Sequence, residues 1–333
     1  MFQARRAVVI ATGTRPFVPP QLELDNLPYW TNHQAIETDQ LPRSLVVMGG
    51  GPVGVELAQV FARFGSAVTV VETGERLLPS EEPEAGDLLA EVLRSEGVTV
   101  HTGSRIASVR HDGYQFTVEV DGVPPVAAER LLVATGRVSD LPALGVESVG
   151  LDADARALPV DERLRVVGAE RLWALGDVTG KGAFTHVSMY QADIVVADIL
   201  GQQLEPADYR ALPRVTFTDP EVGSVGMSER VAIEQGITVR TGMSQIPSAS
   251  RGWIHKAGNQ GFIKLVEDAD RRFLVGATSA GPTGGEILGL LTLAVHARVP
   301  MDTLRHMMYA YPTFHRAVQD ALYDMTARHD GTT

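Results

Sequence analysis

The chain has 333 residues, of which 44% are hydrophobic and 21% are charged, and it contains 33 glycines. This composition is typical of a folded α/β protein of two or three domains. The formal net charge of −12 argues against a nucleic-acid partner, because binding to the phosphate backbone relies on clustered Lys and Arg.

The lack of cysteine excludes a disulfide framework, a thiolate metal site and a cysteine nucleophile within these residues. We expect no metal site of another kind either. The apolar run Ile287–Val295 has about half the length that a membrane span requires. No secretory signal is recognised. The sequence thus predicts a cytoplasmic protein with no membrane partner.

The first predicted strand is Ala7–Ile10, which is followed by a turn of small residues, Ala11–Thr14. A similar phrase, a buried strand followed by Ala-Thr-Gly, recurs at Leu131–Arg137. The repetition indicates two related domains, in each of which a strand ends where a nucleotide could lie. The alternative is a coincidence between two ordinary strand ends.

The stretch Leu45–Glu72 predicts a nucleotide-binding unit. Its continuous apolar run, Leu45–Met48, indicates a buried parallel strand. Gly49, Gly51 and Gly54 then supply the pattern G-x-G-x-x-G. The first glycine permits the tight turn, the second lets the backbone approach a pyrophosphate, and the third allows the helix to pack closely on the strand.

A helical pattern follows from Val53, with Gly65 just past its end as the stop, and a second strand, Val68–Val71, leads to Glu72. An acidic side chain about 20 residues after the glycines accepts hydrogen bonds from a ribose 2′-hydroxyl. Glu72 would also repel a 2′-phosphate, which favours NAD, whereas Arg76 is the nearby candidate for holding NADP. The alternative to a nucleotide site is a glycine-rich turn.

The next residues complete this domain. The pattern predicts a helix over Asp87–Gly97 and short strands over Val98–Val120, with a turn at Asp112–Gly113. A further buried strand, Leu172–Leu175, leads to Asp177. An aspartate at such a place is usually a turn former, so only its position can argue for a function.

A helical pattern follows at Thr185–Leu200, and the character of the chain changes after Pro206. Apolar segments there predict an α+β domain of antiparallel strands followed by helices. The expected strands are 215–217, 222–225, 261–266 and 273–278, and the expected helices are 287–296 and 301–308.

Several short motifs succeed one another along the chain: IATGTRP at Ile10–Pro16, GGGPVGVE at Gly49–Glu56, VATGR at Val133–Arg137, LGDV at Leu175–Val178, FTDPEVGSVG at Phe217–Gly226 and YPT at Tyr311–Thr313. Their order resembles that of the pyridine nucleotide-disulfide oxidoreductase family, the FAD flavoproteins that include dihydrolipoamide dehydrogenase, glutathione reductase, mercuric reductase and soluble transhydrogenase. The resemblance covers essentially the whole chain.

The resemblance implies an α/β fold of Rossmann-like FAD- and NAD(P)-binding domains, followed by an α+β dimerisation domain. The expected FAD-binding domain comprises residues 1–42 and 153–207, and it is incomplete. The expected NAD(P)-binding domain is 43–152, and the dimerisation domain is 208–333.

The resemblance also implies a role for particular residues in holding FAD. Asp177 would accept hydrogen bonds from the ribityl hydroxyls. Thr185 and His186 would begin a helix whose positive end faces the flavin pyrimidine edge. For His186, the alternative is a histidine that merely begins a helix. Three residues of the first small-residue turn would line the FAD: Thr12, Gly13 and Thr14.

For the nicotinamide nucleotide, the resemblance implies a contact at Gly136 in addition to the glycine-rich loop. The full expected set is Gly49, Gly50, Gly51, Pro52, Val53, Gly54, Glu72 and Gly136.

Two further residues are implied as catalytic. In the family, the glutamate that corresponds to Glu56 pairs with a lysine beside the flavin, while the alternative is that Glu56 complements its helix N-terminus. Tyr311 stands where thiol-handling relatives carry a histidine. A tyrosine, which ionises only at about pH 10, is a poor proton shuttle for a thiol. The sequence therefore favours an acceptor that is not a disulfide.

Family members begin with a first FAD-binding βαβ unit and carry a redox-active cysteine pair, and neither is found in these residues. The resemblance implies a FAD-dependent NAD(P)H oxidoreductase, which passes hydride from nicotinamide to flavin and on to a quinone, a dye or a second nicotinamide. It also implies a homodimer. The alternative is a truncated remnant that binds nucleotide and dimerises without redox activity, or a subunit whose FAD half comes from a separate polypeptide.

Overall fold

The structure is a computed structural model that describes residues 4–330. The chain divides into two compact units. One unit contains the described residues up to Phe17 together with Gly136–Tyr209, and the other contains Val18–Thr135 together with the described residues from Arg210 onward. No helix within residues 4–330 is both long enough and apolar enough to cross a membrane.

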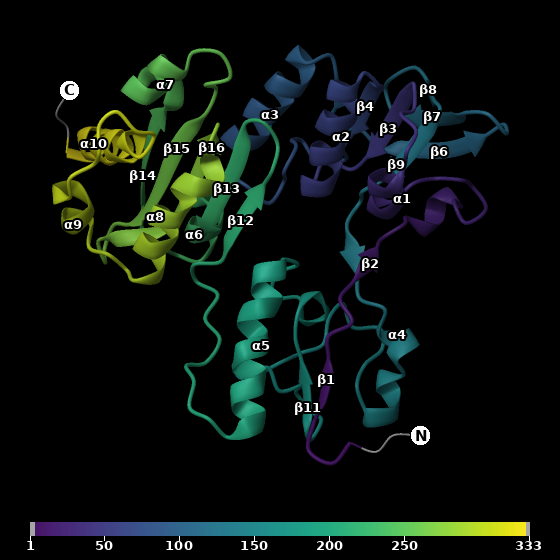
Figure 1. Cartoon of the computed structure of the whole chain (residues 1–333), viewed down its shortest axis with the longest axis horizontal. Coiled ribbons are helices and arrows are strands. Elements are labelled where there is room, and N and C mark those ends of the chain that lie inside the picture. Colours follow the sequence, from purple (N-terminus) through teal and green to yellow (C-terminus); the bar gives the residue numbers. More distant parts are fainter. Residues whose placement is uncertain (1–3, 331–333) are drawn as a thin grey trace. The chain divides into compact units, whose positions relative to one another are not determined.

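The smaller unit is built around two parallel strands, β1 (Val8–Ile10) and β11 (Leu172–Ala174), which lie side by side in Figure 1. A second, antiparallel pair joins β2 (Arg15–Pro16) to β10 (Arg137–Val138). The helices of this unit are α4 (Leu141–Leu144), η2 (Val146–Val149), η3 (Asp177–Thr179) and α5 (Thr185–Leu200). Its buried core includes Leu141, Leu158, Val166, Ala174 and Val178.

The first part of the larger unit contains a four-stranded parallel sheet with the order β5-β4-β3-β9. This is the expected Rossmann-like arrangement. The strands are β3 (Ser44–Met48), β4 (Ala67–Val71), β5 (Thr99–His101) and β9 (Arg130–Val133), and the helices are α1 (Asn32–Glu37), α2 (Pro52–Phe64) and α3 (Pro83–Ser95), with a short turn of helix η1 (Pro20–Leu22). An antiparallel sheet of β6 (Ile106–His111), β7 (Phe116–Val120) and β8 (Val126–Ala128) is inserted before β9.

The second part of the larger unit is an antiparallel sheet with the order β12-β13-β16-β15-β14. The strands are β12 (Pro213–Thr216), β13 (Glu221–Gly226), β14 (Val239–Gln245), β15 (Phe262–Asp268) and β16 (Phe273–Gly281). The helices are α6 (Glu229–Glu234), η4 (Ile246–Ser248), α7 (Ser250–His255), α8 (Gly284–His296), α9 (Met301–His306) and α10 (Arg316–Asp330).

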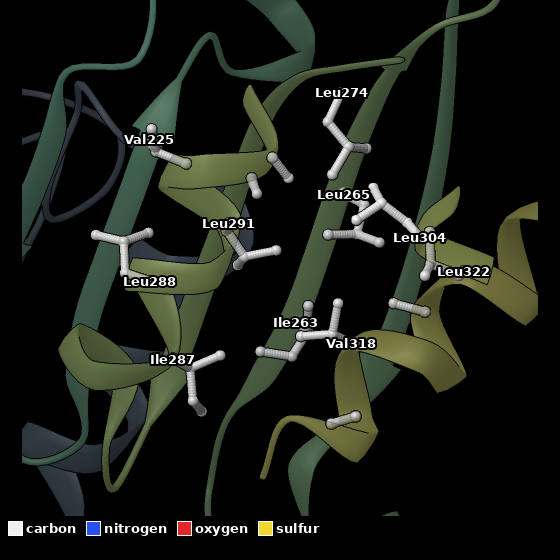
Figure 2. Packing of buried hydrophobic residues seen from close by; sticks show 14 of the residues in the cluster. Val225, Ile263, Leu265, Leu274, Ile287, Leu288, Leu291, Leu304, Val318 and Leu322 are labelled. Atoms are coloured by element: carbon white, nitrogen blue, oxygen red, sulfur yellow. The ribbon is translucent and has the colours of Figure 1, made fainter. Parts of the chain in front are cut away.

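Helices α8 and α10 are held to this sheet by apolar side chains. Figure 2 shows Leu288 and Leu291 of α8, and Val318 and Leu322 of α10, over the side chains of the strands, and all four are buried. Because α8 buries an apolar stripe against β13 and β16, the α+β domain expected from the sequence is confirmed.

Several expected helix boundaries differ from the structure. Helix α8 begins at Gly284 rather than at Ile287. Helix α3 begins at Pro83 rather than at Asp87, since proline at the first helical position needs no N–H partner and its fixed φ suits the first turn. It ends at Ser95, two residues before Gly97. Helix α9 ends at His306 rather than at Met308. The domain boundaries expected from the family remain a prediction.

Candidate functional site

The glycine-rich loop joins β3 to α2 in a turn that only glycine can make. Gly49 has φ = 108°, and a Cβ there would collide with the carbonyl oxygen of Ala134 on the neighbouring strand. A Cβ at Gly54 would collide with the carbonyl oxygen of Gly49. A Cβ at Gly51, in contrast, would meet nothing within 4 Å. The loop is therefore packed tightly against backbone carbonyl groups at Gly49 and Gly54, and it is open at Gly51.

The N-terminus of α2 begins at this open position. Gly51 is its N-cap residue, Pro52 follows as the first helical residue, and no side chain caps the helix. The first N–H groups of such a helix, including that of Val53, have no partner within the helix and carry partial positive charge. An anion such as a pyrophosphate can therefore be bound here.

Glu72, at the end of β4, is 9% exposed and lies beside the glycine-rich loop. Its Oε2 accepts the backbone N–H of Gly50 at 2.5 Å, and its Oε1 accepts the N–H of Gly74 at 2.6 Å. The hydroxyl of Thr73 donates to Oε1 at 3.2 Å. A carboxylate oxygen can accept more than one hydrogen bond, so Glu72 retains capacity for a ribose hydroxyl.

A second group of interacting side chains lies in the smaller unit, where β1 and β11 end next to each other. The hydroxyl of Thr14 donates to Oδ2 of Asp177 at 2.7 Å. Arg137 donates from Nε to that hydroxyl at 2.6 Å and from Nη2 to the Thr14 carbonyl at 2.7 Å. Its Nε also lies 3.4 Å from Oδ2 of Asp177. Thr14 and Asp177, both expected in the FAD site, are thus in direct contact.

Gln191 fixes the turn that carries Asp177. Its side chain is fully buried, and its Oε1 accepts the N–H of Gly176 at 2.5 Å. Its Nε2 donates to the hydroxyl of Tyr209 at 2.8 Å and to that of Thr179 at 3.3 Å. Burial raises the pKa of the Tyr209 hydroxyl, which keeps that partner neutral.

The N-terminus of α5 is also without a side-chain cap. The N-cap residue is Phe184, and Thr185 and His186 form the first turn. The ring of His186 stacks on that of Phe184, with the centroids 5.2 Å apart. Both Thr185 and His186 are exposed, so the start of this helix is accessible to a ligand.

Glu56, on the second turn of α2, has a backbone partner in the C-terminal part of the chain. Its Oε1 accepts the N–H of Phe217 at 2.7 Å. Burial raises the pKa of this carboxyl above its ordinary value of 4.5, and the hydrogen bond from Phe217 partly offsets that shift. The structure therefore gives Glu56 a long-range contact that neither interpretation of the sequence included.

The remaining expected residues are distributed between the units. Tyr311 is 69% exposed and belongs to the larger unit, as do Glu56 and the glycine-rich loop. Gly136 belongs to the smaller unit, where its carbonyl accepts the N–H of Phe17 at 2.9 Å. Thr12 lines a cavity of about 470 Å³ beside β1, and Gly13 follows with φ = 67°.

Sequence reasoning did not assign a role to Arg137 or Gln191. Arg137 closes the VATGR motif, but its contact with Thr14 spans 123 residues and follows no local pattern. Gln191 could have been noticed in the sequence, because it is a polar residue on the apolar face of the predicted helix. The same buried face of α5 carries Val187, Ile194 and Val195. Among residues 4–327, whose side chains the structure describes, no cluster of His, Asp and Glu could hold a metal ion.

The chain matches two families of protein domains. Residues 3–192 match the domain described as pyridine nucleotide-disulphide oxidoreductase, and residues 212–322 match the dimerisation domain of the same name. Among solved structures, LpdA from Mycobacterium tuberculosis is 27% identical with a TM-score of 0.84, and the match covers 95% of this chain and 69% of LpdA. The flavoprotein disulfide reductase RclA from Escherichia coli is 29% identical with a TM-score of 0.83, covering 96% and 73%.

Curated relatives show the same pattern. A dihydrolipoyl dehydrogenase from Chlorobaculum tepidum is 34% identical over 322 residues, and a mercuric reductase from Streptomyces lividans is 36% identical over 323 residues. These matches cover 95% and 96% of this chain and 68% of each relative. Members of the family bind FAD and use a pyridine nucleotide, and the resemblance inferred from the motifs is confirmed. The chain belongs to the pyridine nucleotide-disulphide oxidoreductase family.

Proposed function

We propose that this protein is a FAD-dependent oxidoreductase that takes hydride from NADH in preference to NADPH and delivers electrons to an acceptor other than a disulfide. The observation that carries the proposal is the glycine-rich loop, which is closed behind Gly49 and Gly54 and open at Gly51. Bound FAD would supply the electron-carrying centre between the nicotinamide and the acceptor.

The residues of the chain would bind and orient these groups. In the nucleotide site, the N–H groups at the start of α2 would hold the pyrophosphate next to Gly51, and Glu72 would accept the ribose hydroxyls. In the flavin site, Asp177 has the chemistry to accept ribityl hydroxyls, and Arg137 and Thr14 keep it in place.

The uncapped start of α5 supports the same proposal. Negative charge that develops near the first turn of a 16-residue helix is stabilised by the partial positive charge of its N–H groups. Thr185 and His186 would present this helix end to the flavin. We keep the assignment of Gly136 to the nicotinamide nucleotide as part of the proposal.

The choice of acceptor rests on Tyr311. Tyr311 is exposed and stands where a thiol-handling enzyme needs a proton shuttle near neutral pH. A quinone, a dye or a second nicotinamide accepts electrons without such a shuttle for a thiol.

The match to a dimerisation domain supports a two-fold homodimer, in which Tyr311 of one subunit would reach the site of its partner. We further propose that residues 1–42 and 153–207 contribute to FAD binding, 43–152 to NAD(P) binding and 208–333 to the dimer.

A steady-state screen tests the proposed function. Protein supplied with FAD is mixed with NADH and, in turn, with a disulfide, a quinone, mercuric ion and an oxidised nicotinamide analogue. NADH oxidation that depends on the quinone or the nicotinamide supports the proposal. Oxidation with the disulfide alone contradicts the choice of acceptor, and no oxidation with any of them contradicts the redox function.

A second candidate function is a nucleotide-binding subunit whose FAD site is completed by a separate polypeptide. The observation that favours it is the outer edge of β1, which pairs with β11 and with no other strand among the described residues. Val8 and Val9 are 47% and 41% exposed, and they border the 470 Å³ cavity. An exposed strand edge of this kind accepts a further strand. Protein that is purified alone with bound yellow flavin would exclude this candidate.

A further inference from the structure

Arg76 is the only basic residue in the segment 72–78 that follows β4. This segment is hydrogen-bonded to the glycine-rich loop at both of its ends. Glu72 accepts the N–H of Gly50 near its start, and the N–H of Leu78 donates to the carbonyl of Gly50 at 2.9 Å near its end. Arg76 is therefore held close to the place where the ribose of a bound nucleotide would lie.

The guanidinium of Arg76 already has a carboxylate partner. Its Nε lies 3.0 Å from Oδ1 and 3.3 Å from Oδ2 of Asp87, so both carboxylate oxygens share one donor. Its Nη1 lies 3.7 Å from Oε2 of Glu75. A third carboxylate, that of Glu72, lies at the other end of the same short segment.

The backbone fixes Asp87 next to Arg76. Helix α3 packs so closely on the segment that a Cβ at Gly86 would collide with the carbonyl oxygen of Leu77 and would come within 3.2 Å of the Cβ of Arg76. The next residue of the helix is Asp87. The pairing therefore follows from the docking of α3, although the Arg76 and Asp87 side chains remain 44% and 63% exposed.

We propose that Asp87 is a specificity-determining residue, which disfavours nucleotides with a 2′-phosphate by keeping Arg76 paired. This inference rests on the proposed nucleotide site. A 2′-phosphate next to Glu72 needs a cation to offset the repulsion between the two anions, and arginine is the side chain best suited to bind it. With Asp87 in place, the phosphate must displace a carboxylate from Arg76 before it gains that contact.

The size of the effect follows from the exposure of the pair. Exposed ion pairs contribute modestly, so removal of the Asp87 charge should raise the affinity for a 2′-phosphorylated ligand about threefold to fivefold. The affinity for a ligand that lacks the 2′-phosphate should stay the same, because neither Arg76 nor Asp87 is required to bind the ribose 2′-hydroxyl.

Calorimetric titration with ADP-ribose and with 2′-phospho-ADP-ribose tests the inference, because neither ligand requires a flavin or a reaction. The variants are D87N, R76Q and the double variant D87N/R76Q, each in the full chain. D121N is the matched control, since Asp121 is a similarly exposed carboxylate that pairs with Arg105 at 3.4 Å on another turn of the same unit. It removes the same charge without freeing Arg76.

We expect D87N alone to bind 2′-phospho-ADP-ribose more tightly than the wild type, and we expect the gain to vanish in D87N/R76Q. The inference is wrong if D87N leaves the affinity for 2′-phospho-ADP-ribose unchanged, or if it raises the affinity for both ligands equally. It is also wrong if D121N raises the affinity for 2′-phospho-ADP-ribose as much as D87N does, or if the double variant D87N/R76Q keeps the higher affinity. Each of these results leaves the nucleotide site intact. If ADP-ribose fails to bind the wild type, the proposed nucleotide site is wrong and the role of Asp87 is wrong with it.

Discussion

Oε1 of Glu56 accepts the backbone N–H of Phe217 at 2.7 Å, which ties the second turn of the nucleotide-binding helix to a segment 161 residues further along the chain. The contact couples the position of α2 to the C-terminal sheet, since Phe217 directly follows β12. Glu56 therefore has a structural role in addition to any role beside the flavin.

The first prediction concerns the charge of Glu56. Burial raises its pKa in the folded chain above the ordinary 4.5, so the ionised form costs stability that the protonated form does not. The protonated Glu56 carboxyl contributes stability that is fully present below its pKa in the unfolded chain. This contribution is lost as the pH rises through its pKa in the folded chain. The difference in the free energy of unfolding between E56Q and the wild type should therefore grow in favour of E56Q as the pH rises above 4.5.

Denaturant unfolding over a series of pH values measures this difference. E56A is the control, because alanine leaves the N–H of Phe217 without its acceptor and should be less stable than E56Q at every pH. A difference between E56Q and the wild type that is constant with pH, or that favours the wild type as the pH rises, would show that Glu56 is not destabilised by ionisation.

The second prediction separates the two kinds of glycine in the loop. Alanine at Gly51 meets open space, so G51A should unfold within about 1 kcal/mol of the wild type. Its methyl group would occupy the approach to the pyrophosphate, and the affinity for ADP-ribose should fall about tenfold or more. G54A, in contrast, forces Cβ against the carbonyl of Gly49 and should lose about 2 kcal/mol of stability.

Thermal unfolding and calorimetric titration of G51A and G54A check both halves of this prediction. A G51A protein that binds ADP-ribose as tightly as the wild type would mean that the pyrophosphate does not approach Gly51.

The third prediction concerns Gln191. Q191M fills a similar volume but removes the acceptor of the Gly176 N–H and the donor to Tyr209. A buried N–H that loses its partner costs about 1–3 kcal/mol, and the turn that carries Asp177 should lose its fixed position. We expect lower stability and weaker FAD binding, measured by denaturant unfolding and by flavin fluorescence. M189A, at an exposed position of the same helix, is the control and should change neither.

If Q191M destabilises the protein but leaves the affinity for FAD unchanged, Gln191 supports the fold and does not position Asp177.

The fourth prediction concerns Lys264, which is 6% exposed at the contact between α3 and the C-terminal sheet. Its Nζ lies 2.9 Å from Glu82, 2.7 Å from Glu84 and 2.9 Å from Glu229. Burial alone would lower the pKa of this ammonium, but the hydrogen bonds to the three carboxylates outweigh it and raise the pKa. K264M would leave the carboxylate of Glu82, which is 3% exposed, without its cation, and we expect a loss of about 3–5 kcal/mol.

The matched control is R230M, since Arg230 forms an exposed ion pair with Glu234 and should change stability by about 0.5 kcal/mol or less. Equal effects of K264M and R230M in denaturant unfolding would contradict the assignment of Lys264 as the cation that joins the two parts of this unit.

The parts of the fold that rest on local patterns could be predicted from the sequence. The apolar run ending at Met48, the glycines after it and Glu72 each act through neighbours in the chain, and the structure has the expected strand, helix and strand. Helix α10 could have been recognised as well, because Ala317, Val318, Ala321, Leu322 and Met325 form one buried face.

The contacts that complete the candidate site could not be predicted in this way. The partner of Glu56 is a backbone N–H that becomes available only when β12 ends beside α2, and the pairing of Arg76 with Asp87 depends on where Gly86 lets α3 dock. Arg137 reaches Thr14 only because β2 and β10 pair. Such contacts follow from tertiary packing, which a single sequence does not specify residue by residue.

Anaerobic addition of NADH to the protein supplied with FAD shows whether hydride passes from the nicotinamide to the flavin. We predict that the visible absorbance of the bound flavin bleaches with NADH, and that a larger excess of NADPH is needed for the same change. Bound flavin that keeps its colour in the presence of both reduced nucleotides would mean that the protein is not an NAD(P)H-dependent flavoprotein.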